Sequence, residues 1–216
     1  MELAAIHERL QPFLSAPLSG LQLKHISMYV DMLLRWNARV NLTAVRQPEQ
    51  ILTRHFGESI FTAQQLFPAA INRGRPESND HLIDLGSGAG FPGLPIRICY
   101  HELRVTLIES NNKKATFLRE VVRGLALTNV DVFCGRAEGY AGDRATVVTL
   151  RAVERFDEIS PVAAGLVASA GRLALLIGAA QAGRVQRLVP GFTWSQPMPI
   201  PVSQSRILII GRREPK

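Results

Sequence analysis

Cysteine and lysine are scarce in this sequence of 216 residues, and both shortages narrow what the protein can be. Its two cysteines, Cys99 and Cys134, are too few for a disulfide framework, so we expect a reducing compartment and two small core residues. Lysine occurs four times, so the 25 basic side chains are almost all arginine. Arginine stays charged when buried and binds phosphate through two N–H groups, which favours a nucleic-acid partner.

Long hydrophobic runs are also missing. Residues 1–15 lack a basic segment followed by an apolar run, so no signal peptide is expected. The stretch that most resembles a membrane span, residues 161–180, contains Gly171 and Arg172 and predicts a helix, a turn and a strand. We therefore expect a cytoplasmic protein with no membrane partner and no metal site.

The net charge of +7 is unevenly distributed along the chain. Residues 151–216 contain nine basic and four acidic side chains, so this last third holds most of the excess. Two interpretations stay open: a solubility surface with a basic tail, or a surface that faces a polyanion.

The apolar pattern divides the chain in two. Residues 1–70 show only helical spacing, which predicts an N-terminal helical extension with helices near 3–14, 20–37 and 48–66. Residues 68–80 are rich in Pro, Gly, Asn and Ser and predict a linker. Residues 71–216 alternate between strand and helix patterns, which predicts a second domain built on a doubly wound, mostly parallel sheet. Strands are expected at 81–85, 104–109, 130–134, 146–150 and 172–177, with an antiparallel edge hairpin from 192–198 and 206–210.

The first predicted strand runs directly into a glycine turn, Asp84 to Gly93, where open α/β sheets bind their ligands. Gly88, Gly90 and Gly93 match the dinucleotide fingerprint, but that match alone is weak. Asp84 directly precedes the glycines and would repel a pyrophosphate. It favours a ligand with cationic groups, such as the ammonium and sulfonium of S-adenosylmethionine.

Two further acids follow the next predicted strands. Glu109 ends the second strand, where a carboxylate can accept both ribose hydroxyls of either ligand. Glu138 follows the third strand, where an acid can contact an adenine amino group. Together with Asp84, these positions predict a carboxylate-lined cofactor pocket.

At these residues the sequence resembles a known family, the bacterial small-subunit ribosomal RNA guanine-N7 methyltransferases of the RsmG (glucose-inhibited division protein B) type. The resemblance covers about residues 28–152. It is carried by Tyr29-Val30-x-Met32-Leu33 with Trp36-Asn37, Asn41-Leu42-Thr43, Arg54-His55 with Glu58-Ser59, the turn Asp84–Gly93 with its Phe91-Pro92-Gly93 tail, Lys114 with Phe117-Leu118, Arg136-Ala137-Glu138, and Arg151-Ala152.

The resemblance implies a Rossmann-like class I methyltransferase fold with a seven-stranded sheet. It implies S-adenosylmethionine as cofactor and N7 of a guanine in 16S ribosomal RNA, free or in the small subunit, as the methyl acceptor. We expect the protein to be a monomer. The cofactor-binding residues expected from the motifs and the acids are Asp84, Gly86, Ser87, Gly88, Phe91, Glu109, Ala137, Glu138 and Arg151.

Arg151 ends the fourth predicted strand beside the expected transfer point, so it is the candidate catalytic residue. It could hold a phosphate or guanine O6, or form a salt bridge with a neighbouring acid. Arg54 and His55 are candidate substrate residues; the alternative is a hydrogen bond from helix to core. Guanine N7 is a lone pair and needs no base, so catalysis is expected to depend mainly on alignment.

The chain departs from the family pattern in two places. Leu150 stands where the family has serine before Arg151-Ala152, and the fifth strand ends in Ile177-Gly178 where the family has Lys-Gly. Two other functions stay open at this point: a nicotinamide-dependent oxidoreductase and a noncatalytic RNA-binding module.

Overall fold

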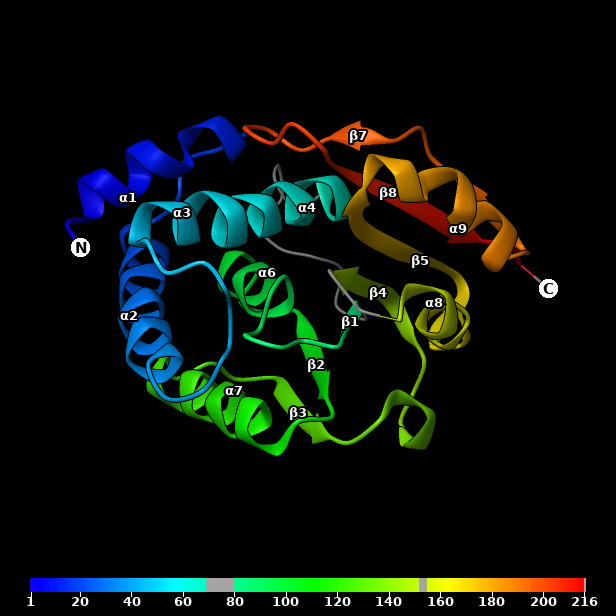
Figure 1. Cartoon of the computed structure of the whole chain (residues 1–216), viewed down its shortest axis with the longest axis horizontal. Helices are drawn as coiled ribbons and strands as arrows, with labels where there is room; N and C mark the ends of the chain where they lie inside the picture. The colour runs from blue at the N-terminus through cyan, green and yellow to red at the C-terminus, as the bar shows by residue number, and fades with distance from the viewer. Residues whose placement is uncertain (69–79, 152–154, 216) are drawn as a thin grey trace.

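A central sheet with helices on both faces forms the body of the protein in the computed structural model, which describes residues 1–68, 80–151 and 155–215 (Figure 1). The sheet order is β3-β2-β1-β4-β5-β8-β6, with β7 paired to β8. The strands β1 to β5 are parallel, and β8 pairs antiparallel with β5, β6 and β7. Their bounds are β1 His81–Leu85, β2 Arg104–Glu109, β3 Val130–Cys134, β4 Ala145–Arg151, β5 Val167–Gly178, β6 Phe192–Trp194, β7 Met198–Pro199 and β8 Arg206–Arg213.

The helices divide between the two faces. Figure 1 shows α2, α6 and α7 on one side of the sheet and α8 and α9 on the other. Helix α1 packs against α2 and helix α4 packs against α6, while the short α3 contacts the turn at residues 52–57. The bounds are α1 Leu3–Leu10, α2 Gly20–Asn37, α3 Pro48–Ile51, α4 Glu58–Leu66, α6 Gly93–Cys99, α7 Asn112–Gly124, α8 Phe156–Gly165 and α9 Ala182–Leu188.

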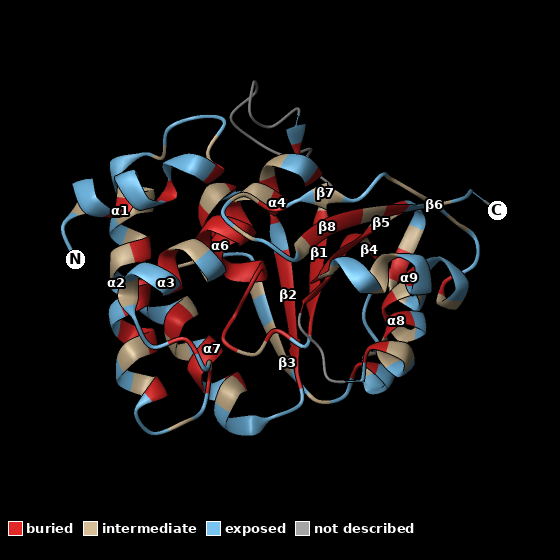
Figure 2. Cartoon of the chain, turned by 45° about the horizontal axis from the view of Figure 1, so that its top comes forward, coloured by how far each residue is buried: buried red, intermediate tan, exposed pale blue. Residues whose placement is uncertain are grey.

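The central strand β1 is buried on both faces, and its successive side chains point to opposite sides of the sheet (Figure 2). Leu82 belongs to the core on the α2–α6–α7 side, and its neighbour Ile83 belongs to the core on the α8–α9 side. Val147 and Val148 divide in the same way. Continuous apolar runs in the sequence therefore become two separate cores.

The N-terminal helices share one of these cores with the sheet. Ile6, Tyr29 and Phe56 lie in the same buried cluster as Leu82 and Leu107. The described N-terminal residues, 1–68, are thus packed against the remainder of the chain by the same contacts that cover one face of the sheet. The division of the chain into two domains at residue 70 stays a prediction. Residues 69–79 of the predicted linker lie outside the described residues.

The predicted α/β architecture is confirmed, with differences at the ends of elements. The helix predicted within residues 161–180 lies at 156–165, and β5 begins at Val167 instead of residue 172. The predicted strand 192–198 is two short strands, β6 and β7, and helix α9 was not predicted because few apolar residues mark it. Cys134 is exposed, so the prediction that it is a core residue was wrong; Cys99 is half-buried.

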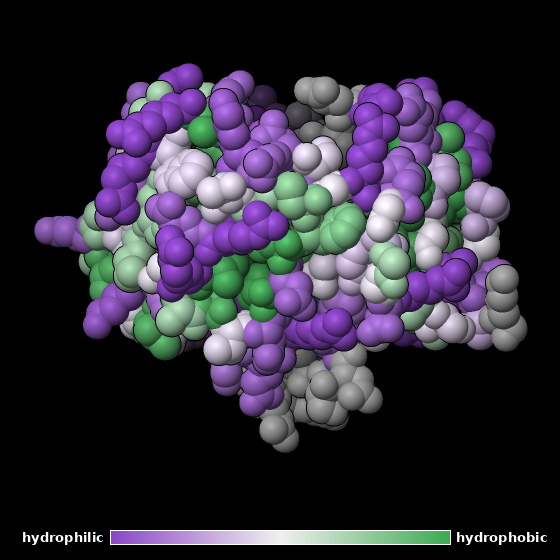
Figure 3. Space-filling view, turned by 90° about the horizontal axis from the view of Figure 1, so that it is seen from below, coloured by the Kyte–Doolittle hydropathy of each residue, from purple (hydrophilic) through white to green (hydrophobic). Residues whose placement is uncertain are grey.

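The surface seen from below is mostly hydrophilic, with apolar side chains gathered near its middle (Figure 3). Among the described residues, none of the helices is both long and apolar enough to cross a membrane.

Candidate active site

The carboxyl ends of the parallel strands bring the predicted site residues to one edge of the sheet. Asp84 lies at the end of β1, Glu109 at the end of the adjacent β2, and Arg151 at the end of β4 on the other side of β1. Glu109 is in register with Cys134 of β3, and its carbonyl accepts a hydrogen bond from Gly135 N–H at 3.0 Å. The chain then continues into the 3₁₀ turn Ala137–Gly139, which contains Glu138.

The glycine turn between β1 and α6 has an open end and a packed end. Gly86, Gly88 and Gly90 all have positive φ, which only glycine adopts freely. Gly86 is exposed and Gly88 half-buried, and a Cβ at Gly88 would meet no atom closer than 3.8 Å. A Cβ at Gly90 would instead collide with the Tyr29 hydroxyl and lie 2.7 Å from Leu94 Cδ1. A ligand can thus approach the Gly86–Gly88 end, whereas Gly90 makes room for a side chain.

Asp84 supports this turn from inside the protein. Its side chain is 1% exposed; Oδ2 accepts from Gly93 N–H at 3.1 Å, and Oδ1 accepts from the Thr149 hydroxyl at 2.8 Å. Burial raises the pKa of Asp84 to about 6, although these hydrogen bonds act to lower it. The carboxyl group therefore occupies the helix N-terminus that a phosphate would need.

The backbone of the turn also disfavours a pyrophosphate. The N–H groups of Gly86 and Ser87 both donate to Ile108 O, and Gly88 N–H donates to Glu109 Oε2 at 2.8 Å. Farther along, Gly90 and Phe91 N–H donate to Ser87 O. A dinucleotide fold binds pyrophosphate through such N–H groups. The oxidoreductase alternative therefore lacks its phosphate site here.

Replacing Asp84 with asparagine is expected to change how stability depends on pH. The folded pKa of about 6 lies above the ordinary value of 3.8, so the folded state holds this proton longer and stability falls as pH rises from about 4 to 6. The variant lacks this loss, so its unfolding free energy relative to wild type should rise by up to roughly 3 kcal/mol over that window. Urea unfolding at several pH values measures the difference.

The variant is compared with wild type at each pH because ionisation of His55 changes stability in the direction opposite to that of Asp84. The pKa of His55 is lowered to about 3, so its contribution to stability is lost as pH falls below 6.5. Asp31→Asn on the exposed surface of α2 is the matched control and should give a curve parallel to wild type. A parallel curve for Asp84→Asn would contradict the prediction.

Glu109 points its carboxylate at the open end of the turn. The side chain is 6% exposed; Oε2 accepts from Gly88 N–H, and Oε1 accepts from Asn111 N–H at 2.7 Å. Each carboxylate oxygen has two acceptor sites, so each retains one for a ribose hydroxyl. This carboxylate, fixed beside an uncrowded glycine, fits the ribose of a nucleoside cofactor.

Arg151 is buried in a cluster that joins the sheet to the N-terminal helices. Its Nη2 donates to Arg54 O at 2.6 Å, lies 3.0 Å from His55 Nδ1, and lies 3.2 Å from Glu58 Oε2. Arg206, at the start of β8, binds Glu58 Oε1 through Nε at 3.1 Å and Nη2 at 2.5 Å. The salt-bridge alternative for Arg151 is therefore present in the structure.

His55 is neutral in this cluster. Burial, together with the positive charges of Arg151 and Arg206, lowers its pKa to about 3. Because Nδ1 accepts from Arg151, the proton lies on Nε2, which donates to Thr43 Oγ1 at 2.8 Å. The hydrogen bond from helix to core that was the alternative for His55 is thus present. The side chain of Arg54, in contrast, is exposed.

A π-helical turn, Leu52–Gly57, places Arg54 and His55 between α3 and α4. The widened turn presents Arg54 O to the guanidinium groups of Arg151 and Arg206, at 2.6 and 3.4 Å. Such turns inside helices often occur at functional sites. The spacing of apolar residues did not reveal it, because helical periodicity continues across residues 48–66.

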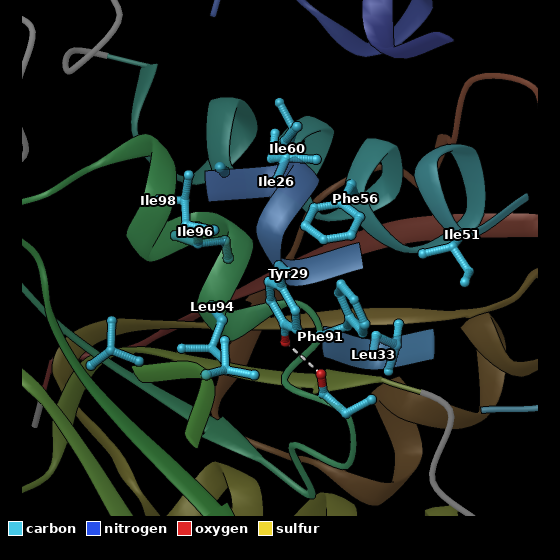
Figure 4. Close-up of a cluster of buried hydrophobic side chains, with 14 of the residues drawn as sticks. Ile26, Tyr29, Leu33, Ile51, Phe56, Ile60, Phe91, Leu94, Ile96 and Ile98 are labelled. Carbon is cyan, nitrogen blue, oxygen red and sulfur yellow. Dashed lines mark hydrogen bonds between the residues drawn. The ribbon is translucent and has the colours of Figure 1, made fainter. Parts of the chain in front are cut away.

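Phe91 connects the glycine turn to the helices (Figure 4). It stacks on Tyr29 with ring centroids 5.4 Å apart and on His55 at 4.7 Å, and Phe56 contacts it edge-on. Tyr29 OH donates to Ala89 O at 2.5 Å, the dashed line in Figure 4. Phe91 is 7% exposed, and Ser87 is 3% exposed with its hydroxyl donating to Asp84 O. Their direct contact with a cofactor stays a prediction.

Three residues that shape this site have no predicted role. Tyr29 and Glu58 belong to motifs that carry the family resemblance, and Arg206 begins a predicted strand. A charged residue within an otherwise apolar helix face was the available signal for Glu58. Nothing local marks Arg206, because its partner is 148 residues away.

Comparison with known proteins identifies the family. The GidB family, described as rRNA small subunit methyltransferase G, matches residues 22–197. The chain belongs to the GidB family. A Ribosomal RNA small subunit methyltransferase G from Streptococcus gordonii is 36% identical over 165 residues, 74% of this chain and 66% of the relative. One from Streptococcus pneumoniae (strain R6) is 37% identical over 166 residues, 74% and 67% of the two chains. The chain spans about two thirds of the length of these relatives.

Solved structures confirm the fold of this GidB-family chain. TrmN from Thermus thermophilus has a TM-score of 0.58 and 17% identity, covering 75% of this chain and 53% of its own. TYW2 from M. jannaschii, in complex with AdoMet, has a TM-score of 0.55 and 14% identity, covering 64% and 70%. These likenesses establish the Rossmann-like fold of class I methyltransferases.

The departures from the family pattern lie at the same edge of the sheet. Leu150 is fully buried beside Leu85 of β1, so its side chain packs in the core. Ile177 is 5% exposed, and Gly178 ends β5 opposite Arg206 of β8. Ala152 of the Arg-Ala motif lies outside the described residues.

Proposed function

We propose that this GidB-family chain transfers the methyl group of S-adenosylmethionine to N7 of a guanine in small-subunit (16S) ribosomal RNA. Family membership supports rRNA methylation. The observation that carries the cofactor assignment is the glycine turn, whose open end faces the Glu109 carboxylate and whose helix N-terminus is filled by Asp84. S-adenosylmethionine, which has no phosphate and two cationic groups, matches that site.

The site residues divide by their position. Gly86, Gly88, Glu109 and Glu138 would line the cofactor edge, where Glu109 would accept the ribose hydroxyls and Glu138 would contact the adenine amino group. Asp84, Ser87, Phe91 and Ala137 are buried and hold the turns in place. Arg151 would then lie beside the transfer point with its guanidinium fixed by the N-terminal helices.

The chemistry needs alignment more than proton transfer. S-adenosylmethionine supplies an electrophilic methyl group, and guanine N7 accepts it with a lone pair, so no proton is removed. His55, the imidazole beside Arg151, has its pKa lowered to about 3 and its Nδ1 bound, so it is a poor proton acceptor. The residues of the edge would therefore act by holding the two reactants in line.

The substrate is tested with purified protein, labelled S-adenosylmethionine and two acceptors, naked 16S RNA and assembled small subunits. Mass mapping should locate the label at N7 of a single guanine. Cofactor binding without transfer to either acceptor would overturn the substrate assignment and favour a noncatalytic RNA-binding module. We propose that the protein acts as a monomer in the cytoplasm; sedimentation with and without RNA measures its oligomeric state.

Glu109→Ala is expected to weaken S-adenosylmethionine binding by about 10–100-fold, because hydrogen bonds to a charged group contribute about 1.5–3 kcal/mol. Isothermal titration calorimetry measures this affinity. Glu109→Gln retains an acceptor and should lose less, and Glu102→Ala, an exposed control, should match wild type. Equal affinities for all four proteins would show that Glu109 does not bind the ribose.

A further inference from the structure

A polar cleft of about 270 Å³ lies between the π-helical turn and the loop that joins β7 to β8. The N-terminal helices form one wall and the loop forms the other. Its polar lining consists of Thr53, Arg54, Glu58 and residues 203–206. Phe13, Pro201 and Val202 complete it. None of the predicted cofactor residues lines this cleft, so it is separate from the glycine turn.

The cleft carries uncompensated positive charge. Arg54 is exposed, and its guanidinium has no hydrogen-bond or ion-pair partner among the described residues. Arg206 binds Glu58 through Nε and Nη2, which leaves Nη1 without a partner in the described part of the chain. Arg151 and Arg206 share the single carboxylate of Glu58. The exposed guanidinium of Arg54 adds a further positive charge at the cleft, which favours an anion there.

The loop adds neutral hydrogen-bonding groups in a fixed conformation. Arg206 N–H donates to Ser203 Oγ at 3.2 Å, and Ser203 N–H donates to Ile200 O at 3.2 Å. Gln204 and Ser205 are exposed at the cleft. Val202 has φ of +60° and is 72% exposed, a conformation that costs a β-branched residue about 1–3 kcal/mol and often occurs at functional sites.

The cleft shares its inner wall with the Arg151 cluster. Arg54 O accepts hydrogen bonds from both Arg151 and Arg206, so one peptide group separates the cleft from the arginine beside the transfer point. We propose that the cleft binds the backbone phosphate of the RNA strand next to the target guanine, with Arg54 and Arg206 as the cationic ligands and Ser205 and Gln204 as neutral donors. The proposal rests on the RNA substrate of the proposed function.

Arg54→Gln tests the cleft without disturbing the buried cluster, because only the backbone of Arg54 takes part in it. RNA affinity, measured by fluorescence anisotropy with a labelled fragment of 16S RNA, should fall about 5–10-fold. The slope of log K against log salt should decrease in magnitude by about 0.7–1, the value expected for one lost phosphate contact. KM for RNA should rise more than kcat falls, and S-adenosylmethionine affinity should stay unchanged.

Gln204→Glu is the second variant and Arg144→Gln the matched control. Gln204 is exposed, so glutamate adds a negative charge at nearly constant size, and RNA affinity should fall about threefold or more. Arg144 is an exposed arginine just before β4, at the opposite edge of the sheet, and its variant should bind RNA as wild type does.

The outcomes separate this proposal from the proposed function. Unchanged RNA affinity and salt slope in both Arg54→Gln and Gln204→Glu, with methyl transfer retained, would overturn the cleft as a phosphate site and leave the function intact. Equal loss in Arg144→Gln would likewise overturn it, by showing a nonspecific effect of net charge. Absence of transfer by the wild-type protein would instead count against the function itself.

Discussion

Alanine at Gly90 is expected to lower the free energy of unfolding by about 4 kcal/mol. The new Cβ would collide with the Tyr29 hydroxyl and lie 2.7 Å from Leu94 Cδ1. Overpacking a core costs about 1–3 kcal/mol, and a φ of +88° adds about 1–3 kcal/mol of backbone strain for alanine. Urea unfolding measures the loss, which should be accompanied by weaker S-adenosylmethionine binding because the whole turn shifts.

Alanine at Gly88 makes the same chemical change with a different expected result. Its φ of +57° costs about 1–2 kcal/mol, but its Cβ meets no protein atom closer than 3.8 Å. The methyl group would occupy the open end of the turn, so S-adenosylmethionine affinity should fall more than tenfold while the free energy of unfolding falls by only about 1–2 kcal/mol. Similar stability losses at Gly88 and Gly90 would contradict the division of the turn into an open and a packed end.

Two controls accompany this pair. Gly183→Ala lies in α9, where a Cβ meets nothing within 4 Å, and should leave stability unchanged or raise it by up to about 1 kcal/mol. Tyr29→Phe removes the colliding hydroxyl and should recover part of the Gly90→Ala loss in the double variant. The Leu94 contact and the backbone strain would remain.

Glu58→Ala is expected to lower the free energy of unfolding by about 3–5 kcal/mol. Glu58 is 3% exposed and is the carboxylate that contacts both Arg151 and Arg206, so its removal leaves two guanidinium groups beside each other. A change of this size should lower the melting temperature of a chain of this length by about 6–20 °C. Calorimetry measures the shift, and methyl transfer should fall with it because Arg151 loses its anchor.

Glu102→Ala provides the matched control for this loss. Glu102 is half-exposed and pairs only weakly with His101 at 3.9 Å, so its removal should change stability by less than about 0.5 kcal/mol. Replacing Glu58, Arg151 and Arg206 together by methionine should recover much of the stability, since no uncompensated charge stays buried, but not methyl transfer. A stable Glu58→Ala variant with normal activity would show that the cluster does not hold Arg151.

The gathering of Asp84, Glu109 and Arg151 at one edge of the sheet could be predicted from the sequence because its signals are local. A strand, a turn and a helix follow each other within Asp84–Gly93, and parallel strands must bring Glu109 and Arg151 to the same edge. The contacts of Arg151 could not be predicted in this way. They depend on the carbonyl of Arg54, on the side chains of His55 and Glu58, and on Arg206, which come together only when the N-terminal helices pack at the carboxyl edge of the sheet.

The scarcity of lysine and the arginine excess indicated a polyanion partner, and the motif residues indicated the family and its cofactor. The arginine excess is a sum over all residues and each motif is a short stretch of sequence, so folding alters neither. Tertiary structure decided which groups are accessible. It placed Asp84 inside the turn, made His55 neutral through burial, divided the arginines between the buried Arg151 and the exposed Arg54, and formed the cleft at the β7–β8 loop. Burial and long-range pairing determine these properties, and neither follows from the order of residues alone.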